Sequence, residues 1–135
     1  MSTAPPCLGD ALRQVMRGVA ATVTLVTTEQ DGVWYGMTAT SFTSLSLDPP
    51  QFLACMDNRA KTLAAIASGG AFCIHYLSDQ QQHLSAHFAR PGGDRFAGIP
   101  YRTGVTGVPI LEGVIAYVEC QLAEIRPGGD HSIVI

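Results

Sequence analysis

Residues 36–52, GMTATSFTSLSLDPPQF, carry the pattern that decides the fold. This stretch holds three Ser and three Thr among apolar residues, and Asp48-Pro49-Pro50 follow these hydroxyl residues. From Thr38 onward the side chains alternate with a period of two, but neither face of a single strand would be cleanly apolar. We therefore expect a strand, a bend near residues 41–43, and a second strand that the two prolines end.

The segments on both sides of this stretch also predict strands. Residues 21–29 are β-branched almost throughout, and the turn signal QDG joins them to residues 33–39 as a hairpin. Further strands are expected at 51–57, 71–78, 111–127 and 131–135. Because only short helices separate them, the fold class is mainly β, a closed or nearly closed β-barrel with short helices.

Helical spacing of apolar residues predicts three short helices. They cover residues 8–19, residues 61–68 before a Gly-Gly stop, and residues 79–90 with Asp79 as the N-cap. Residues 91–109 are rich in Gly and Pro and read as an irregular loop. A loop of that length is more often functional than a plain connection.

The composition indicates one domain, residues 1–135, with a substantial core. Hydrophobic residues make up 47% of the chain and charged residues only 14%, so we expect part of the apolar surface to meet a partner subunit. The formal net charge is -3, and the basic residues are thinly spread. This distribution argues against nucleic acid as a partner.

The cysteines favour a reducing cytoplasm. They are far apart and form no CxxC pair, and three of the four lie in apolar runs with strand character, where a free thiol acts as a small buried hydrophobe. The N-terminal residues show neither a basic region followed by an apolar one nor a run of spanning length. We therefore expect neither export nor membrane insertion.

Several common catalytic motifs are missing from the sequence. There is no GxGxxG, GxxxxGK[ST] or GxSxG, so a dinucleotide-binding Rossmann site, a P-loop and a hydrolase elbow have no support. His83 and His87 are one helical turn apart, which is metal-ligand spacing, but no third ligand accompanies them. An exposed polar helix face is the better interpretation, and no metal site is predicted.

The hydroxyl-rich stretch and the segment DNRAKT together suggest a ligand site. Small hydroxyls beside exposed amides suit a flat polar ligand or a phosphate. Arg59 and Lys61 add positive charge, and Asn58 and Thr62 add hydrogen-bonding groups at a helix N-terminus. The pattern alone is equally consistent with a Ser/Thr-rich strand followed by a capped helix, so both interpretations stay open.

A family resemblance favours the ligand site. The segments GMTATSFTSLSLDPPQFLACMDNRAKT, FCIHYLS, HFARPGGDRFAG, PILEGVIAYVECQL and GGDHSIVI occur in this order. They resemble the flavin reductase family, the NAD(P)H:flavin oxidoreductases with an FMN-binding split barrel. The resemblance runs from about Leu12 to Ile135, and the combination of TAxSFTSxSxDPP with a late GDH is its most specific part.

The resemblance implies a six-stranded split barrel in a homodimer. It also implies FMN or FAD as the flavin, NADH or NADPH as co-substrate, and a flavin-dependent monooxygenase that receives the reduced flavin. No protein nucleophile is needed, since hydride passes from nicotinamide C4 to flavin N5 and the protein aligns the two rings. Two alternatives remain: a non-catalytic or repurposed flavin-binding split barrel, and, more remotely, an oxidase of the pyridoxamine-phosphate oxidase type.

The resemblance also assigns cofactor-binding residues. The residues that would line the isoalloxazine and ribityl chain, largely through backbone groups, are Met37, Thr38, Ala39, Thr40 and Ser41. Those near the phosphate end would be Ser44, Asn58, Arg59 and Thr62. Arg90 and Phe96 would border the flavin or nicotinamide, and His131 of the GDH motif would face the nicotinamide.

The last residues carry one further expectation. Ile135 stands within an apolar β run, whereas members of the family continue for several tens of residues beyond the GDH motif. We therefore expect a single flavin reductase-like split-barrel domain that lacks its C-terminal part.

Overall fold

The computed structural model describes residues 8–20, 22–89 and 96–135. The helices are α1 (Leu8–Arg17), α2 (Lys61–Gly69), the 3-10 helix η1 (Asp79–Gln81) and α3 (Gln82–Ala89). The strands are β1 (Thr24–Gln30), β2 (Val33–Ala39), β3 (Phe42–Leu47), β4 (Pro50–Asp57), β5 (Ala71–Tyr76), β6 (Tyr101–Thr103), β7 (Pro109–Leu111), β8 (Ala116–Gln121), β9 (Ile125–Gly128) and β10 (His131–Val134).

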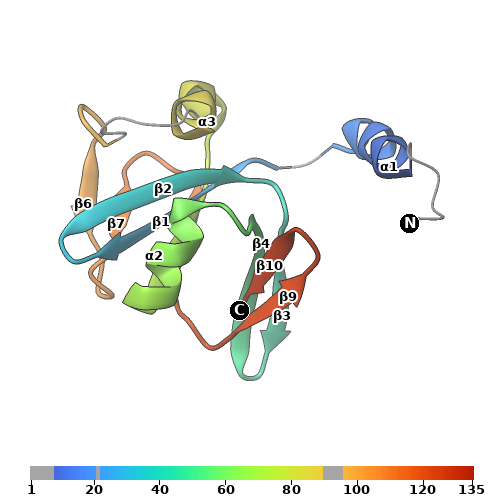
Figure 1. Cartoon of the computed structure of the whole chain (residues 1–135). Coiled ribbons are helices and arrows are strands. Elements are labelled where there is room, and N and C mark those ends of the chain that lie inside the picture. The colour runs from blue at the N-terminus through green and yellow to red at the C-terminus, as the bar shows by residue number, and fades with distance from the viewer. Residues whose placement is uncertain (1–7, 21, 90–95) are drawn as a thin grey trace.

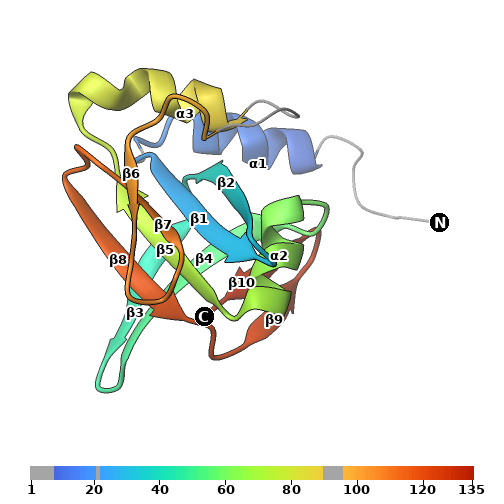
Figure 2. The same cartoon turned by 90° about the vertical axis from the view of Figure 1, so that its left-hand side faces the viewer.

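The strands form two four-stranded antiparallel sheets and one small hairpin (Figures 1 and 2). The first sheet has the order β2-β1-β5-β8, the second has the order β3-β4-β10-β9, and β6 pairs with β7. The chain passes from the first sheet to the second through Thr40 and Ser41, between β2 and β3. The bend predicted in the hydroxyl-rich stretch is therefore confirmed, although it begins one residue before the predicted position.

The main core lies between the two sheets and is covered by α2. It joins Val26 and Phe72 of the first sheet to Met56 and Val134 of the second, with Ile66 from α2, and all five side chains are inaccessible to solvent. A second core cluster joins Leu84 and Phe88 of α3 to Leu25 of β1, Leu111 of β7 and Phe96. Because apolar side chains of both sheets point into one core, the two sheets stabilise each other.

Helix α1 stands apart from both sheets (Figure 1). None of its residues is buried, and Leu12, Val15 and Met16 remain more than half exposed. The predicted amphipathic helix is confirmed, but its apolar face packs on nothing within the described residues. No helix in the described ranges is both long and apolar enough to cross a membrane.

The prediction of one strand over residues 111–127 is wrong. The segment contains the last residue of β7, all of β8 and most of β9. Gly113 adopts a φ of 80°, which turns the chain after β7. After β8 the chain leaves the first sheet: Leu122 N donates to Gly70 O, and Ala123 N donates to Ile135 O. Gly113 marks the first break locally. Strand propensity is high on both sides of the second break, so only the tertiary arrangement marks that one.

Two more expectations need correction. The segment 91–109 was predicted as an irregular loop, but its described part contains β6 and the start of β7, with Thr103 opposite Pro109. Ser78, and not Asp79, is the N-cap of η1: Ser78 N donates to Gln81 Oε1, and Gln81 N donates to Ser78 O. The glycine stop of α2 is confirmed, since Gly70 adopts the left-handed conformation and its N–H bonds Ile66 O.

Candidate functional site

The register of the second sheet gathers several predicted site residues at one end. Phe42 of β3 lies opposite Ala54 of β4, and Cys55 N donates to Ser41 O. At the far end of β4, Asp57 lies opposite His131, the first residue of β10. The start of β3, the end of β4 and the start of β10 therefore meet at the edge where the chain turns into α2.

Asn58 connects two turns at this edge. Its backbone N–H donates to Asp130 O at 3.1 Å, and its side-chain Nδ2 donates to Gly129 O at 3.2 Å. Its Oδ1 accepts a hydrogen bond of 2.6 Å from Ser132 Oγ. The turn that precedes α2 and the turn between β9 and β10 are therefore joined through one residue.

Arg59 is held by the neighbouring carboxylate. Its Nε lies 3.2 Å from Asp57 Oδ1, its other guanidinium nitrogen Nη2 lies 3.1 Å from Oδ2, and its backbone N–H also donates to Oδ1. This hydrogen bonding lowers the pKa of Asp57 to about 2, and it raises the pKa of Arg59. Because the Arg59 side chain is still 91% exposed, its guanidinium remains open to a ligand in solvent.

His131 is paired with an acid in the same turn. Its Nδ1 lies 2.7 Å from Asp130 Oδ1, and the imidazole is partly exposed. With Nδ1–H donating to the carboxylate, Nε2 is the ring atom that can meet a ligand. This pairing orients the imidazole ring.

The predicted residues of β2 use their side chains for packing. Ala39 is buried in the main core, and Met37 packs against that core from its edge. Thr38 Oγ1 donates to Ser85 O at 2.6 Å, which ties β2 to α3. A ligand at this strand would therefore meet mainly backbone groups and the exposed Thr40 and Ser41 beyond its end.

Other predicted residues lie away from this edge. Ser44 lies opposite Phe52, six residues before Asn58 on the extended β4, which corresponds to roughly 20 Å. Thr62 is only 5% exposed in α2, and Phe96 is 5% exposed in the second core cluster. Arg90 lies outside the described residues. The roles assigned to these four residues remain predictions.

Two residues at this edge were missed by sequence reasoning. Asp57 neutralises Arg59, and Ser132 binds the Asn58 side chain. Asp57 had a readable signal, since it stands beside Asn58-Arg59 where a strand meets a helix. Ser132 had none, because its partner lies 74 positions earlier in the chain.

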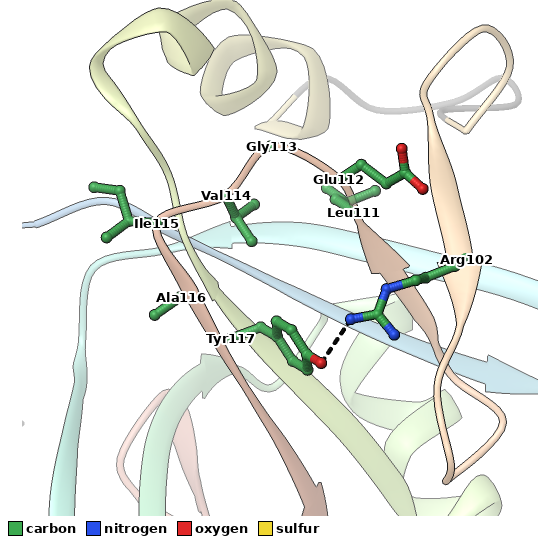
Figure 3. A pocket seen from close by; sticks show the side chains of 8 residues that line it. All are labelled: Arg102, Leu111, Glu112, Gly113, Val114, Ile115, Ala116 and Tyr117. Carbon is green, nitrogen blue, oxygen red and sulfur yellow. Dashed lines mark hydrogen bonds between the residues drawn. The ribbon is translucent and has the colours of Figure 1, made fainter.

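A separate pocket opens between β6 and β8 (Figure 3). It has a volume of about 490 Å³, and Leu111 and Ile115 are among its apolar lining residues. Arg102 Nη2 donates to Tyr117 Oη at 2.6 Å, and the guanidinium carbon lies 5.1 Å from the centre of the phenol ring. None of the predicted site residues lines this pocket.

The edge formed by the two turns has donors that fit a flavin. Thr40 and Ser41 lie exposed between β2 and β3. Ser41 O accepts a hydrogen bond from Cys55 N, and Arg59, which supplies a guanidinium, follows Cys55 by four positions. Hydroxyls, backbone amides and a guanidinium are the donors that ring carbonyl oxygens and phosphates accept. These donors therefore match the chemistry of a flavin, which is an anionic ligand rich in hydrogen-bond acceptors.

Comparisons with known proteins also indicate a flavin-related domain. Residues 16–135 match the family model described as "Flavin reductase like domain". The reductase subunit HsaB of a flavin-dependent monooxygenase from Mycobacterium tuberculosis is 38% identical over 122 residues, which cover 90% of this chain. The same alignment covers 65% of the subunit, so the chain spans less than two thirds of that relative.

Solved structures share the fold. Nitrilotriacetate monooxygenase component B from Mycobacterium thermoresistibile superposes with a TM-score of 0.90 at 37% identity, over 93% of this chain and 70% of that one. The NADH:FAD oxidoreductase SgcE6 of Streptomyces globisporus, in complex with NAD and FAD fragments, gives a TM-score of 0.89 at 32% identity, over 99% and 81%. The resemblance and the fold class read from the sequence are therefore confirmed.

Proposed function

Because this chain belongs to the flavin reductase-like domain family, we propose that it carries an NAD(P)H-dependent flavin reductase activity. The substrates would be free FMN or FAD and NADH or NADPH, and the product would be reduced flavin for a monooxygenase. The family match over residues 16–135 is the observation that carries the proposal. The structure of a similar oxidoreductase with NAD and FAD fragments supports the choice of both ligands.

The end of β2, the connection from β2 to β3 and the edge of the second sheet have distinct roles in this proposal. When bound, the flavin supplies the acceptor for a hydride from the nicotinamide. Backbone amides near Met37 to Ser41 would hold the flavin ring and stabilise negative charge there. Arg59, kept in place by Asp57, would attract the phosphate end. The imidazole of His131, oriented by Asp130, would contact the nicotinamide.

A direct absorbance assay of nicotinamide oxidation tests this function. The purified chain is mixed with NADH or NADPH and with FMN or FAD, and loss of nicotinamide absorbance is followed in all four combinations. Oxidation that depends on both the chain and an added flavin is expected. Flavin binding without any turnover would favour the alternative of a non-catalytic flavin-binding barrel. The absence of both binding and turnover would overturn both hypotheses.

A homodimer and a monooxygenase partner belong to the same proposal. The exposed apolar side chains of α1, together with Ile115 just before β8 and Tyr117 within it, support a subunit contact. Light scattering after gel filtration is expected to give twice the mass of one chain. A monooxygenase partner is supported by the names of two similar proteins, the reductase subunit HsaB and nitrilotriacetate monooxygenase component B.

A cytoplasmic location is also part of the proposal. It is supported by Cys55, Cys73 and Cys120, which are free thiols in the structure. Cell fractionation that recovers the chain with cytoplasmic markers is the expected result.

A further inference from the structure

Asn58 forms three hydrogen bonds to the turn between β9 and β10 and the start of β10, which a side chain that only binds phosphate does not require. Its N–H, its Nδ2 and its Oδ1 each form a hydrogen bond, with Asp130 O, Gly129 O and Ser132 Oγ. All three partners lie more than 70 positions later in the chain. Both polar atoms of the side chain are therefore engaged within the protein.

Only one orientation of the Asn58 amide satisfies these bonds. Gly129 O is an acceptor, so it must face the NH₂ group, which leaves the amide oxygen to accept the hydroxyl of Ser132. The reversed amide would set two carbonyl oxygens against each other. Aspartate at this position would create the same conflict and would add a third carboxylate beside Asp57 and Asp130.

We propose that Asn58 is a positioning residue that holds the 129–131 turn, and with it His131, against the turn that precedes α2. The inference rests on the proposed function, since the contact of His131 with the nicotinamide is part of that function. The sequence suggested instead that Asn58 lies near the flavin phosphate. In the positioning role, its loss would act on the nicotinamide and would leave the flavin largely unaffected.

The local backbone explains why the turn needs such support. The β10 ladder reaches its end at His131, which lies opposite Asp57 on one side and Gly128 on the other. Beyond these pairs, Gly129 adopts a φ of 72°, and both Gly129 and Asp130 are exposed. The hydrogen bonds from Asn58 extend the contact between β4 and β10 past the last ladder pair. They therefore restrain the residue to which the His131 ring is attached.

Hydrogen exchange of the ligand-free chain tests the positioning directly. Asn58→Ala is expected to speed exchange of the backbone amides of residues 130–132 at least tenfold, while the amides of β1 and β5 keep their rates. Ser132→Ala removes one of the three bonds, and about a threefold effect on the same turn is expected. Gln80→Ala, which removes an exposed amide side chain on η1, is the matched control and should leave all these rates unchanged. Unchanged rates in both Asn58→Ala and Ser132→Ala would overturn the proposal.

Steady-state kinetics separate positioning from flavin binding. Asn58→Ala is expected to raise the KM for the nicotinamide about tenfold, with kcat and the Kd for flavin changed less than twofold. Ser132→Ala should raise the same KM about threefold, and it decides the question if Asn58→Ala does not fold. A Kd for flavin that rises as much as the KM would overturn the proposal and return Asn58 to the phosphate site. If the wild-type chain has no reductase activity, the proposed function fails, but the exchange rates still decide whether Asn58 positions the turn.

Discussion

His75 of β5 and Leu111 of β7 are joined by a fully buried hydrogen bond. Leu111 N donates to His75 Nε2 at 3.1 Å, and His75 Nδ1 lies 3.0 Å from Leu25 O in β1. One neutral tautomer satisfies both contacts, with Nδ1–H as donor and Nε2 as acceptor. The imidazole therefore links the first sheet to the β6-β7 hairpin, and burial lowers the pKa of His75 to about 4.

This buried imidazole predicts a pH dependence of stability. Above pH 6.5 the ring is neutral in both the folded and the unfolded chain, so His75 contributes no pH dependence there. As the pH falls from 6.5 to 4, the unfolded chain binds the proton first, and stability falls by up to about 3 kcal/mol. Urea unfolding measured at pH 7.5, 5.5 and 4 tests this.

His75→Leu isolates that contribution. At pH 7.5 it should cost about 2–4 kcal/mol, because Leu25 O and Leu111 N lose their buried partner. It should also flatten the stability profile between pH 6.5 and 4. His83→Leu, at an exposed position on α3, is the control and should change neither property. A wild-type profile retained by His75→Leu would assign the pH dependence to other groups.

The second prediction concerns Gly36 on β2. A Cβ there would lie 2.8 Å from two ring carbons of Phe88 and 3.2 Å from the ring of Phe96. Gly36→Ala is expected to destabilise the chain by about 1–3 kcal/mol, since these rings are packed in the second core cluster. Thermal unfolding measures the loss.

A double mutant tests the cause of that loss. In Phe88→Leu, the smaller side chain removes the ring, so adding Gly36→Ala should cost less than it does in the wild type. Gly9→Ala, where nothing lies within 4 Å, serves as the control for an added methyl group. Additive costs of Gly36→Ala and Phe88→Leu would contradict the proposed clash.

The third prediction concerns His131. His131→Ala should raise the KM for the nicotinamide about fivefold to tenfold, as expected for the loss of one hydrogen bond, with the Kd for flavin little changed. Steady-state kinetics and flavin titration provide both values. Asp130→Asn, which keeps the ring but weakens its pairing, should have a smaller effect of the same kind. An equal loss of flavin and nicotinamide binding would contradict the role given to His131.

The fourth prediction concerns thiol reactivity. Burial raises the pKa of Cys73 to about 12 and that of Cys120 to about 11, so each is almost entirely protonated at pH 8. Alkylation of both residues by iodoacetamide should be at least 100-fold slower in the folded chain than in urea. Peptide mass spectrometry distinguishes these two sites. Similar rates in the folded and unfolded chain would contradict the burial of Cys73 and the partial burial of Cys120.

The sequence predicted those features that local pattern controls. The bend after Ala39 was visible because alternation fails to give one apolar face, and the end of α2 was visible as two glycines. The break between β8 and β9, within residues 111–127, was not visible. Strand-forming residues continue through it, and the break exists because β8 and β9 belong to different sheets.

The candidate site was predictable in its residue types but not in its connections. Asn58 and Arg59 were identified as polar ligand-binding residues before a helix. The partner of Arg59, Asp57, lies two positions earlier in the chain. The partners of Asn58, Gly129 and Ser132, come close to it only because β4 pairs with β10. A pairing between strands that are far apart in sequence cannot be read from either segment alone.

Helix α1 has a practical consequence for studies of this chain. A helix of ten residues without buried side chains is only marginally stable by itself, and its Arg13 and Arg17 are exposed. Trypsin should therefore cut at these arginines quickly in isolated subunits and slowly in the proposed homodimer, if a second subunit covers the helix there. The rate of this cleavage, measured as a function of protein concentration, would report on subunit association.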